Sequence, residues 1–233
     1  MPKYNAPLMS IDAKETRRYA GLSKAPDFNK KTVQQACREV LYTAEPKGSW
    51  EIYDYDAKNG IVLADKPFQL EGKKVTKHLC RAEKVVIMAV TIGEAVEEEI
   101  SRRFKEGDYT LALLMDAAAT TAVEQIADGI EKAVDQKIAM LGLVRRWRFS
   151  PGYGDWPIDC QPEMLRLSKA AEIGLGATSS LMLNPRKSVT AIIGLVPKED
   201  DNAPDKQSCK FCPNPQCTFR AKPFEAPDNK TEA

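Results

Sequence analysis

The sequence Val85-Val-Ile-Met-Ala-Val-Thr-Ile92 is a continuous apolar run made mostly of β-branched residues. A short run of this kind, ended here by Gly93, is typical of a β-strand buried on both faces. We therefore expect a strand in the core of the protein.

Segments on both sides of this strand carry their own patterns. Strand-like alternation before and after Asn59-Gly60, a dipeptide suited to a tight turn, predicts a hairpin. Strands are predicted at 50–55, 60–64, 181–183 and 188–195, the last two on either side of Asn184-Pro185-Arg186, and helices at 10–19, 32–44, 94–104, 109–141 and 162–172. Hairpin signals outnumber strand-helix-strand repeats, which predicts an α+β fold with a mixed or antiparallel sheet and a long helix.

Composition excludes several classes of function. Lys and Arg total 34 against 33 Asp and Glu, so no overall field attracts nucleic acid, and the run Arg145-Arg-Trp-Arg148 is more typical of a partly solvated face. No Gly-rich phosphate loop is present. No segment is apolar enough to span a bilayer and no signal pattern begins the chain, so we expect a cytoplasmic protein with no membrane partner.

The segment Arg148-Phe149-Ser150-Pro151-Gly152-Tyr153 places a guanidinium, a rigid turn and a phenol close together. Pro151 has a fixed φ and Gly152 can take a positive φ, so the pair predicts a sharp bend beside which backbone groups are open to a ligand. Arg148 is suited to hold a carboxylate there. An ordinary Pro-Gly turn with an exposed arginine is the alternative.

This segment resembles the signature of the S-adenosylmethionine-binding activation domain of cobalamin-dependent methionine synthase. Upstream, residues 117–128 resemble the helix that supplies an acidic residue near the cobalamin in this family; downstream, residues 187–191 resemble the strand that follows. Val90-Thr-Ile-Gly93 is similar to members in which the activation domain is a separate polypeptide.

The resemblance implies a subunit that reactivates a corrinoid methyltransferase and thereby serves methionine biosynthesis. It would bind S-adenosylmethionine and dock on a cobalamin-binding methionine synthase or a related corrinoid protein. It would support reductive methylation of cob(II)alamin, while a flavodoxin- or ferredoxin-like donor supplies the electron. The corrin would be carried by the partner, so this chain would be one component of the methyltransferase.

The same resemblance implies roles for individual residues. Arg148 would pair with the carboxylate of S-adenosylmethionine, and backbone groups of Phe149 and Ser150 would hold its adenine or ribose end. Glu124 and Tyr153 would lie near the cobalt and organise water as its axial ligation changes. From the residues alone, Glu124 can equally be a solvated helix position and Tyr153 a packing residue.

The chain departs from the family pattern at two positions. Thr120 stands where the family has an aspartate, one helical turn before Glu124, and Ile193 stands where it has a ligand-contacting tyrosine. Two rival functions remain open. One is an adaptor that docks on a corrinoid protein and carries a metal or iron-sulfur site without using S-adenosylmethionine. The other is a stand-alone methyltransferase, against which the missing Gly-rich strand-to-helix loop argues.

A polar linker after Pro197 leads to Cys209-Lys-Phe-Cys212-Pro-Asn-Pro-Gln-Cys217, so we divide the chain into a domain at 1–197 and a Cys-rich tail at 198–233. Cysteines at C-x2-C-x4-C spacing are suited to zinc or an iron-sulfur cluster. Three unmetallated thiols are the alternative. The candidates for a fourth ligand are Cys160, Cys80 and the only histidine, His78.

Overall fold

The computed structural model describes residues 3–5 and 8–200, in which helices and strands alternate irregularly. The helices are α1 (Ala13–Tyr19), α2 (Lys30–Thr43), α3 (Lys73–His78), α4 (Ala95–Lys105), α5 (Tyr109–Ile138) and α6 (Gln161–Ser168). The strands are β1 (Lys3–Tyr4), β2 (Lys47–Asp56), β3 (Ile61–Leu63), β4 (Phe68–Gln69), β5 (Lys84–Thr91), β6 (Leu143–Arg145), β7 (Gly176–Ala177), β8 (Leu183–Asn184) and β9 (Ser188–Pro197).

The main sheet is antiparallel, with strands in the order β4-β3-β2-β5-β9-β6 and with β1 paired to the beginning of β2. Strand β5 is central: Met88 lies opposite Trp50 of β2 on one side and opposite Ala191 of β9 on the other. The predicted hairpin at Asn59-Gly60 is confirmed, because β2 pairs with β3 across it. The α+β class with an antiparallel sheet and a long helix is confirmed as well.

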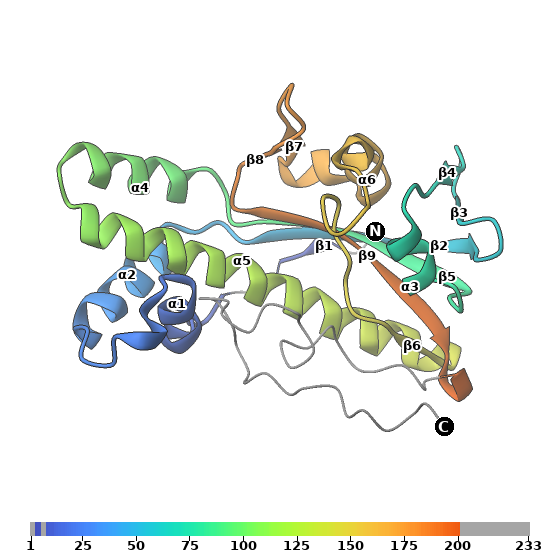
Figure 1. Ribbon diagram of the computed structural model, residues 1–233, viewed down its shortest axis with the longest axis horizontal. Coiled ribbons are helices and arrows are strands. Elements are labelled where there is room, and N and C mark those ends of the chain that lie inside the picture. The colour runs from blue at the N-terminus through green and yellow to red at the C-terminus, as the bar shows by residue number, and fades with distance from the viewer. Residues whose placement is uncertain (1–2, 6–7, 201–233) are drawn as a thin grey trace, which may run out of the picture.

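Helices cover both faces of this sheet (Figure 1). Helix α5 runs along one face with α1, α2 and α4 beside it, and α6 packs on the opposite face. Alternation along β5 supplies both cores: Val86, Met88 and Val90 belong to the cluster beneath α5, whereas Val85 and Ile87 belong to the cluster on the other side. The predicted burial of this strand on both faces is confirmed.

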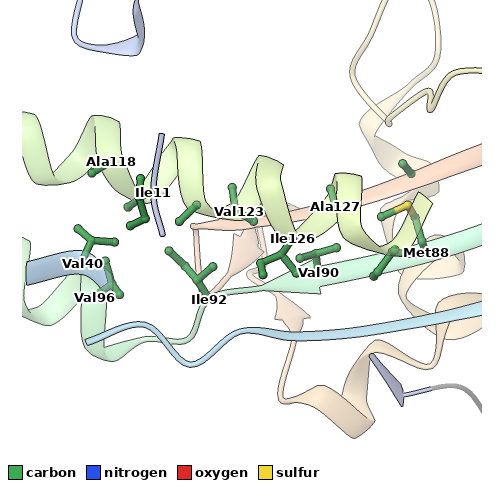
Figure 2. Close-up of a cluster of buried hydrophobic side chains, with 14 of the residues drawn as sticks. Ile11, Val40, Met88, Val90, Ile92, Val96, Ala118, Val123, Ile126 and Ala127 are labelled. Carbon is green, nitrogen blue, oxygen red and sulfur yellow. The ribbon is translucent and has the colours of Figure 1, made fainter. Parts of the chain in front are cut away.

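Helix α5 lies close to the sheet because its inner face carries small side chains. Ala118, Ala122 and Ala127 have no exposed surface, and Figure 2 shows Ala127 and Ile126 beside Val90 of β5. The approach to β2 is equally tight, since a Cβ added at Gly48 would lie 2.5 Å from the Ile130 side chain. This packing fixes the helix that forms one wall of the candidate site.

Several predicted boundaries differ from the structure, and three of them bear on the surroundings of the site. Helix α5 ends at Ile138, because residues 139–141 tighten into a 3-10 turn that Gly142 closes at φ 67°. Helix α6 ends at Ser168, because Lys169 adopts a left-handed φ of 57°. Strand β8 covers Leu183–Asn184 and pairs with β7 in a separate two-stranded sheet.

The predicted boundary between residues 1–197 and 198–233 coincides with the end of β9 at Pro197. Residues 198–200 form a short 3-10 turn. The rest of the tail lies outside the described residues, so the division into domain and tail stays a prediction.

Candidate functional site

A cavity of about 500 Å³ opens between α5 and the segments that precede α6 and β9. Its wall is drawn from four parts of the chain: Glu124 and Glu131 on α5, the segment 147–153, Ile158 with Gln161, and residues 181–190. The lining is mainly apolar, with two acids, two arginines (Arg148 and Arg186) and hydroxyl groups placed among apolar side chains. Ligand sites commonly have this composition.

The segment 146–149 is held against β9 by backbone hydrogen bonds. Phe149 N–H donates to the Ile192 carbonyl (2.9 Å), and Ile192 N–H donates back to the Phe149 carbonyl (2.8 Å). These two bonds fix where the chain leaves the sheet and enters the cavity wall. They also engage the Phe149 N–H, which the sequence analysis had expected to be open to a ligand.

The predicted bend at Pro151-Gly152 is confirmed. Tyr153 N–H donates to the Ser150 carbonyl (3.2 Å), which closes a four-residue turn, and Gly152 adopts a φ of 84°. A positive φ at the third position of such a turn favours glycine. Gly152 shapes the turn without lining the cavity, whereas Ser150, Pro151 and Tyr153 line it.

The start of helix α3 is hydrogen-bonded to the loop that follows the Pro151-Gly152 turn. The carboxylate of Asp155 accepts hydrogen bonds from the backbone N–H groups of Lys73 (2.9 Å) and Lys74 (3.0 Å) at the start of the helix. Hydrogen bonding from these N–H groups, that of Lys74 first, lowers the pKa of Asp155. The loop after the turn is therefore anchored to α3.

The other end of α3 contacts the residue before Arg148. His78 Nε2–H donates to the Trp147 carbonyl (2.9 Å), and the two ring centroids are 4.0 Å apart. Burial is the main cause that lowers the pKa of His78 below 6.5; the Trp147 carbonyl opposes it and the charge of Arg146 adds to it. His78 thus holds the cavity-lining Trp147 in place.

Arg148 projects toward α5, where it contacts three carboxylates. Its Nη2 lies 2.5 Å from Glu124 Oε2, and its Nη1 lies 2.7 Å from both Asp128 Oδ1 and Glu131 Oε1. Burial opposes the charge on Arg148, but Glu131 and Glu124 outweigh it and raise the pKa of the guanidinium. Arg148 therefore remains a cation at the cavity wall.

Glu131 is the buried centre of this ion-pair network. Its side chain is only 4% exposed, and its second oxygen lies 2.9 Å from Arg145 Nη1. Arg145 also pairs with Asp135, whose Oδ1 lies 2.8 Å from Nε without the alignment of a hydrogen bond. A buried carboxylate needs such partners, because an unpaired charge in the interior is strongly unfavourable.

The structure thus brings Glu124, Arg148, Phe149, Ser150 and Tyr153 together around one cavity, as the sequence analysis expected of its site residues. Their catalytic and binding roles stay predictions. The Tyr153 side chain is 66% exposed, and its ring packs edge-on against Phe149 at 6.4 Å. Its phenol is open to a ligand or a partner.

Sequence reasoning identified Glu124 but missed Asp128 and Glu131, and it missed that all three share Arg148. Glu124, Asp128 and Glu131 follow one another at spacings of four and three, which places them on one face of α5. That pattern signals a common acidic face. It does not reveal which arginine, 17 to 24 positions away, the face will contact.

The opposite wall was missed as well. Gln161, at the start of α6, donates from Nε2 to Thr190 Oγ1 of β9 at 2.7 Å, and both side chains are buried and line the cavity. Leu181, beside the cavity, has a left-handed φ of 63°, and Met182 next to it is largely exposed.

The two departures from the family pattern lie away from the cavity lining. Thr120 accepts a hydrogen bond from Lys187 Nζ at 3.0 Å. Ile193 has no exposed surface and packs in the core beneath α5. In this chain, therefore, neither position forms part of the cavity wall.

The predicted metal ligands Cys209, Cys212 and Cys217 lie outside the described residues. Within residues 3–5 and 8–200, no group of three or more His, Cys, Asp or Glu side chains is arranged to hold a metal ion. Cys160 donates from Sγ to the Pro157 carbonyl (2.9 Å), and burial raises its pKa to about 12. Metal coordination needs a thiolate, so the burial of Cys160 disfavours it as a fourth ligand.

In the part of the chain that the structure describes, no helix combines the length and the apolar character needed to cross a membrane.

Comparison with known proteins relates this fold to solved structures. No family model matches the chain. No curated protein matches it either. Among solved structures, the chain is similar to the MetH reactivation domain bound to AdoHcy, with a TM-score of 0.55 and 14% sequence identity over 88% of this chain and 80% of that one. At this identity the likeness shows a shared fold, which confirms the expected relationship at the level of architecture.

Proposed function

We propose that this protein binds S-adenosylmethionine in the cavity beside Arg148 and acts as a reactivation subunit. Its partner would be a cobalamin-dependent methionine synthase or a related corrinoid methyltransferase. The observation that carries the proposal is the coincidence of two features. The fold is shared with a reactivation domain bound to AdoHcy, and the cavity lies at the Arg148–Tyr153 turn.

The cavity suits a nucleoside that carries an amino acid. Its volume of about 500 Å³ falls within the range of roughly 300–1,000 Å³ that small-molecule sites occupy. Apolar and aromatic side chains such as Trp147, Ile158 and Met182 offer surface for the adenosyl group. Arg148 offers a fork for the carboxylate of the methionine part.

Binding at the turn falls to Ser150 and to the ring of Phe149. Because the Phe149 N–H is bonded to Ile192, we assign the backbone contact with the ribose or adenine to Ser150. Phe149 then contributes the face or edge of its ring. This ring packs against the rings of His78, Trp147 and Tyr153.

The reaction supported would be the reductive methylation of cob(II)alamin carried by the partner. One electron comes from a flavodoxin- or ferredoxin-like donor, the methyl group comes from S-adenosylmethionine, and S-adenosylhomocysteine is released. The present chain would contribute positioning and electrostatics. Exposed apolar side chains at the cavity, among them Tyr153 and Met182, suit contact with the partner.

Tyr153 and Glu124 would act beside the reacting methyl group by organising water. Both line the cavity, and the phenol of Tyr153 is exposed. A Tyr153→Phe variant should therefore bind S-adenosylmethionine with unchanged affinity and slow methylation about tenfold, which corresponds to the loss of one hydrogen bond in the transition state.

The test is methylation of cob(II)alamin on a corrinoid partner with S-adenosylmethionine and a reductant, compared with and without this protein. Tyr109→Phe is the matched control, because Tyr109 is also an exposed tyrosine but lies at the start of α5, away from the cavity. Stimulation that needs Tyr153 and not Tyr109 supports the proposal. A protein that docks on the partner but neither binds S-adenosylmethionine nor stimulates methylation would instead be an adaptor.

A further inference from the structure

Arg148, the proposed partner of the ligand carboxylate, is already paired with an acidic side chain of the cavity wall. Arg148 and Glu124 both line the cavity, and Arg148 Nη2 lies 2.5 Å from Glu124 Oε2. A carboxylate on a ligand would seek the same face of the guanidinium, since an arginine fork binds carboxylates through its N–H groups in one plane. Glu124 occupies the position that such a ligand needs.

The partners of Arg148 differ in how easily each can leave. Glu131 is buried and is held by Arg145 as well as by Arg148, so its departure would leave two guanidiniums short of charge. Glu124 is 37% exposed and can turn toward solvent at little cost. Asp128 is exposed too, but it contacts Nη1 and does not line the cavity.

We propose that Glu124 gates Arg148: it occupies the guanidinium in the empty protein, and a ligand that bears a carboxylate binds by exchanging with it. This inference rests on the proposed function, because it concerns the same cavity and ligand. It makes Glu124 a residue that sets specificity, since a ligand without a carboxylate has nothing to exchange.

The charges on this wall of the cavity require that the ligand carboxylate replaces Glu124 beside Arg148 and does not simply add to it. Among the described residues, four carboxylates on this face of α5 (Glu124, Asp128, Glu131 and Asp135) pair with two guanidiniums, those of Arg145 and Arg148. Arg186, the other arginine that lines the cavity, pairs with Glu97. If Glu124 stayed in place, the carboxylates of α5 would repel a ligand carboxylate beside Arg148, because their negative charge is not fully compensated. Exchange also leaves Glu124 free of Arg148, which is the state that its proposed role beside the reacting methyl group requires.

The experiment is calorimetric titration of the full chain and its Glu124→Gln variant with two probes. One probe is S-adenosylmethionine, and the other is 5′-methylthioadenosine, which keeps the nucleoside and lacks the amino acid. Removing the competing charge should tighten S-adenosylmethionine binding by about three- to fivefold, the upper part of the range for an exposed ion pair. The affinity for 5′-methylthioadenosine should not change, which also shows that the variant is folded.

Asp135→Asn is the matched control. It removes one carboxylate from the same helix, but Asp135 pairs with Arg145 and does not line the cavity. Its affinity for S-adenosylmethionine should stay within about twofold of the parent, as expected of an exposed pair outside the site.

Each outcome bears on the gate. Unchanged or weaker binding of S-adenosylmethionine by Glu124→Gln, with clear binding by the parent, overturns the gate and leaves the proposed function standing. An equal gain for both probes also overturns it, because the effect would not depend on the carboxylate. If neither protein binds S-adenosylmethionine, the proposed function fails and the gate fails with it.

Discussion

Arg148 Nη1 lies 2.7 Å from Glu131 Oε1, so the segment that leads into the Pro151-Gly152 turn is tied directly to the middle of α5. Among the described residues Glu131 is the only buried carboxylate, and Arg145 binds its other oxygen. The same ion pair therefore shapes the cavity and joins a loop to the long helix.

Replacing Glu131 by Gln should destabilise the protein. Two partly buried guanidiniums would lose their shared partner, although Glu124, Asp128 and Asp135 still compensate part of the charge. We expect a loss of about 2 kcal/mol in the free energy of unfolding by urea, below the roughly 3–5 kcal/mol of a fully buried pair. Asp135→Asn, at an exposed position, should cost less than about 1 kcal/mol. Equal losses for the two variants would show that Glu131 contributes no more to stability than the exposed Asp135.

His78 should make stability depend on pH in a defined window. Its pKa is lowered in the folded protein, so above pH 6.5 it is neutral in both states and contributes nothing to the pH dependence. As the pH falls below 6.5, the unfolded chain takes up a proton that the folded protein resists, and stability decreases until the folded pKa is passed. The free energy of unfolding should therefore fall between about pH 6.5 and 5, before most carboxylates titrate.

His78→Gln separates this effect from other groups, because the Gln amide can still donate to the Trp147 carbonyl and does not titrate. His78 is the only histidine of the chain, so its proton NMR signal reports the folded pKa without ambiguity. A midpoint at or above 6.5 would contradict the burial argument.

Metal binding by the cysteines of the tail is a separate prediction. If Cys209, Cys212 and Cys217 bind zinc or an iron-sulfur cluster, a chelator should change the protease sensitivity of residues beyond Pro197 and leave the rest folded. Metal analysis of anaerobically purified protein gives the content, and Cys160→Ser should leave it unchanged, because the Cys160 thiol is partly buried with a raised pKa. Protein without stoichiometric metal and with three titratable tail thiols would exclude the site.

Local signals in the sequence predicted most of the architecture. The continuous apolar run at 85–92 identifies a strand with two buried faces, and the Pro151-Gly152 pair identifies the turn, because both depend on neighbouring residues alone. The pairing of β8 with β7 is local, but each strand has only two residues and so shows no alternation along the sequence. The pairing of Arg148 with acids of α5 depends on distant contacts and was not predictable. The Phe149 N–H was expected to be open for the same reason, since its partner Ile192 lies on a strand far along the chain.

The most direct test of the account is calorimetric titration of the full chain with S-adenosylmethionine. We predict binding at one site, weakened by Arg148→Ala by about 1.5–3 kcal/mol, the range for a hydrogen bond to a charged group. Arg148→Lys should restore only part of it, because lysine lacks the planar fork. Arg166→Ala is the control, since Arg166 also pairs with two carboxylates but lies outside the cavity lining. Absence of binding by the parent, or binding that Arg148→Ala leaves unchanged, would contradict the central claim.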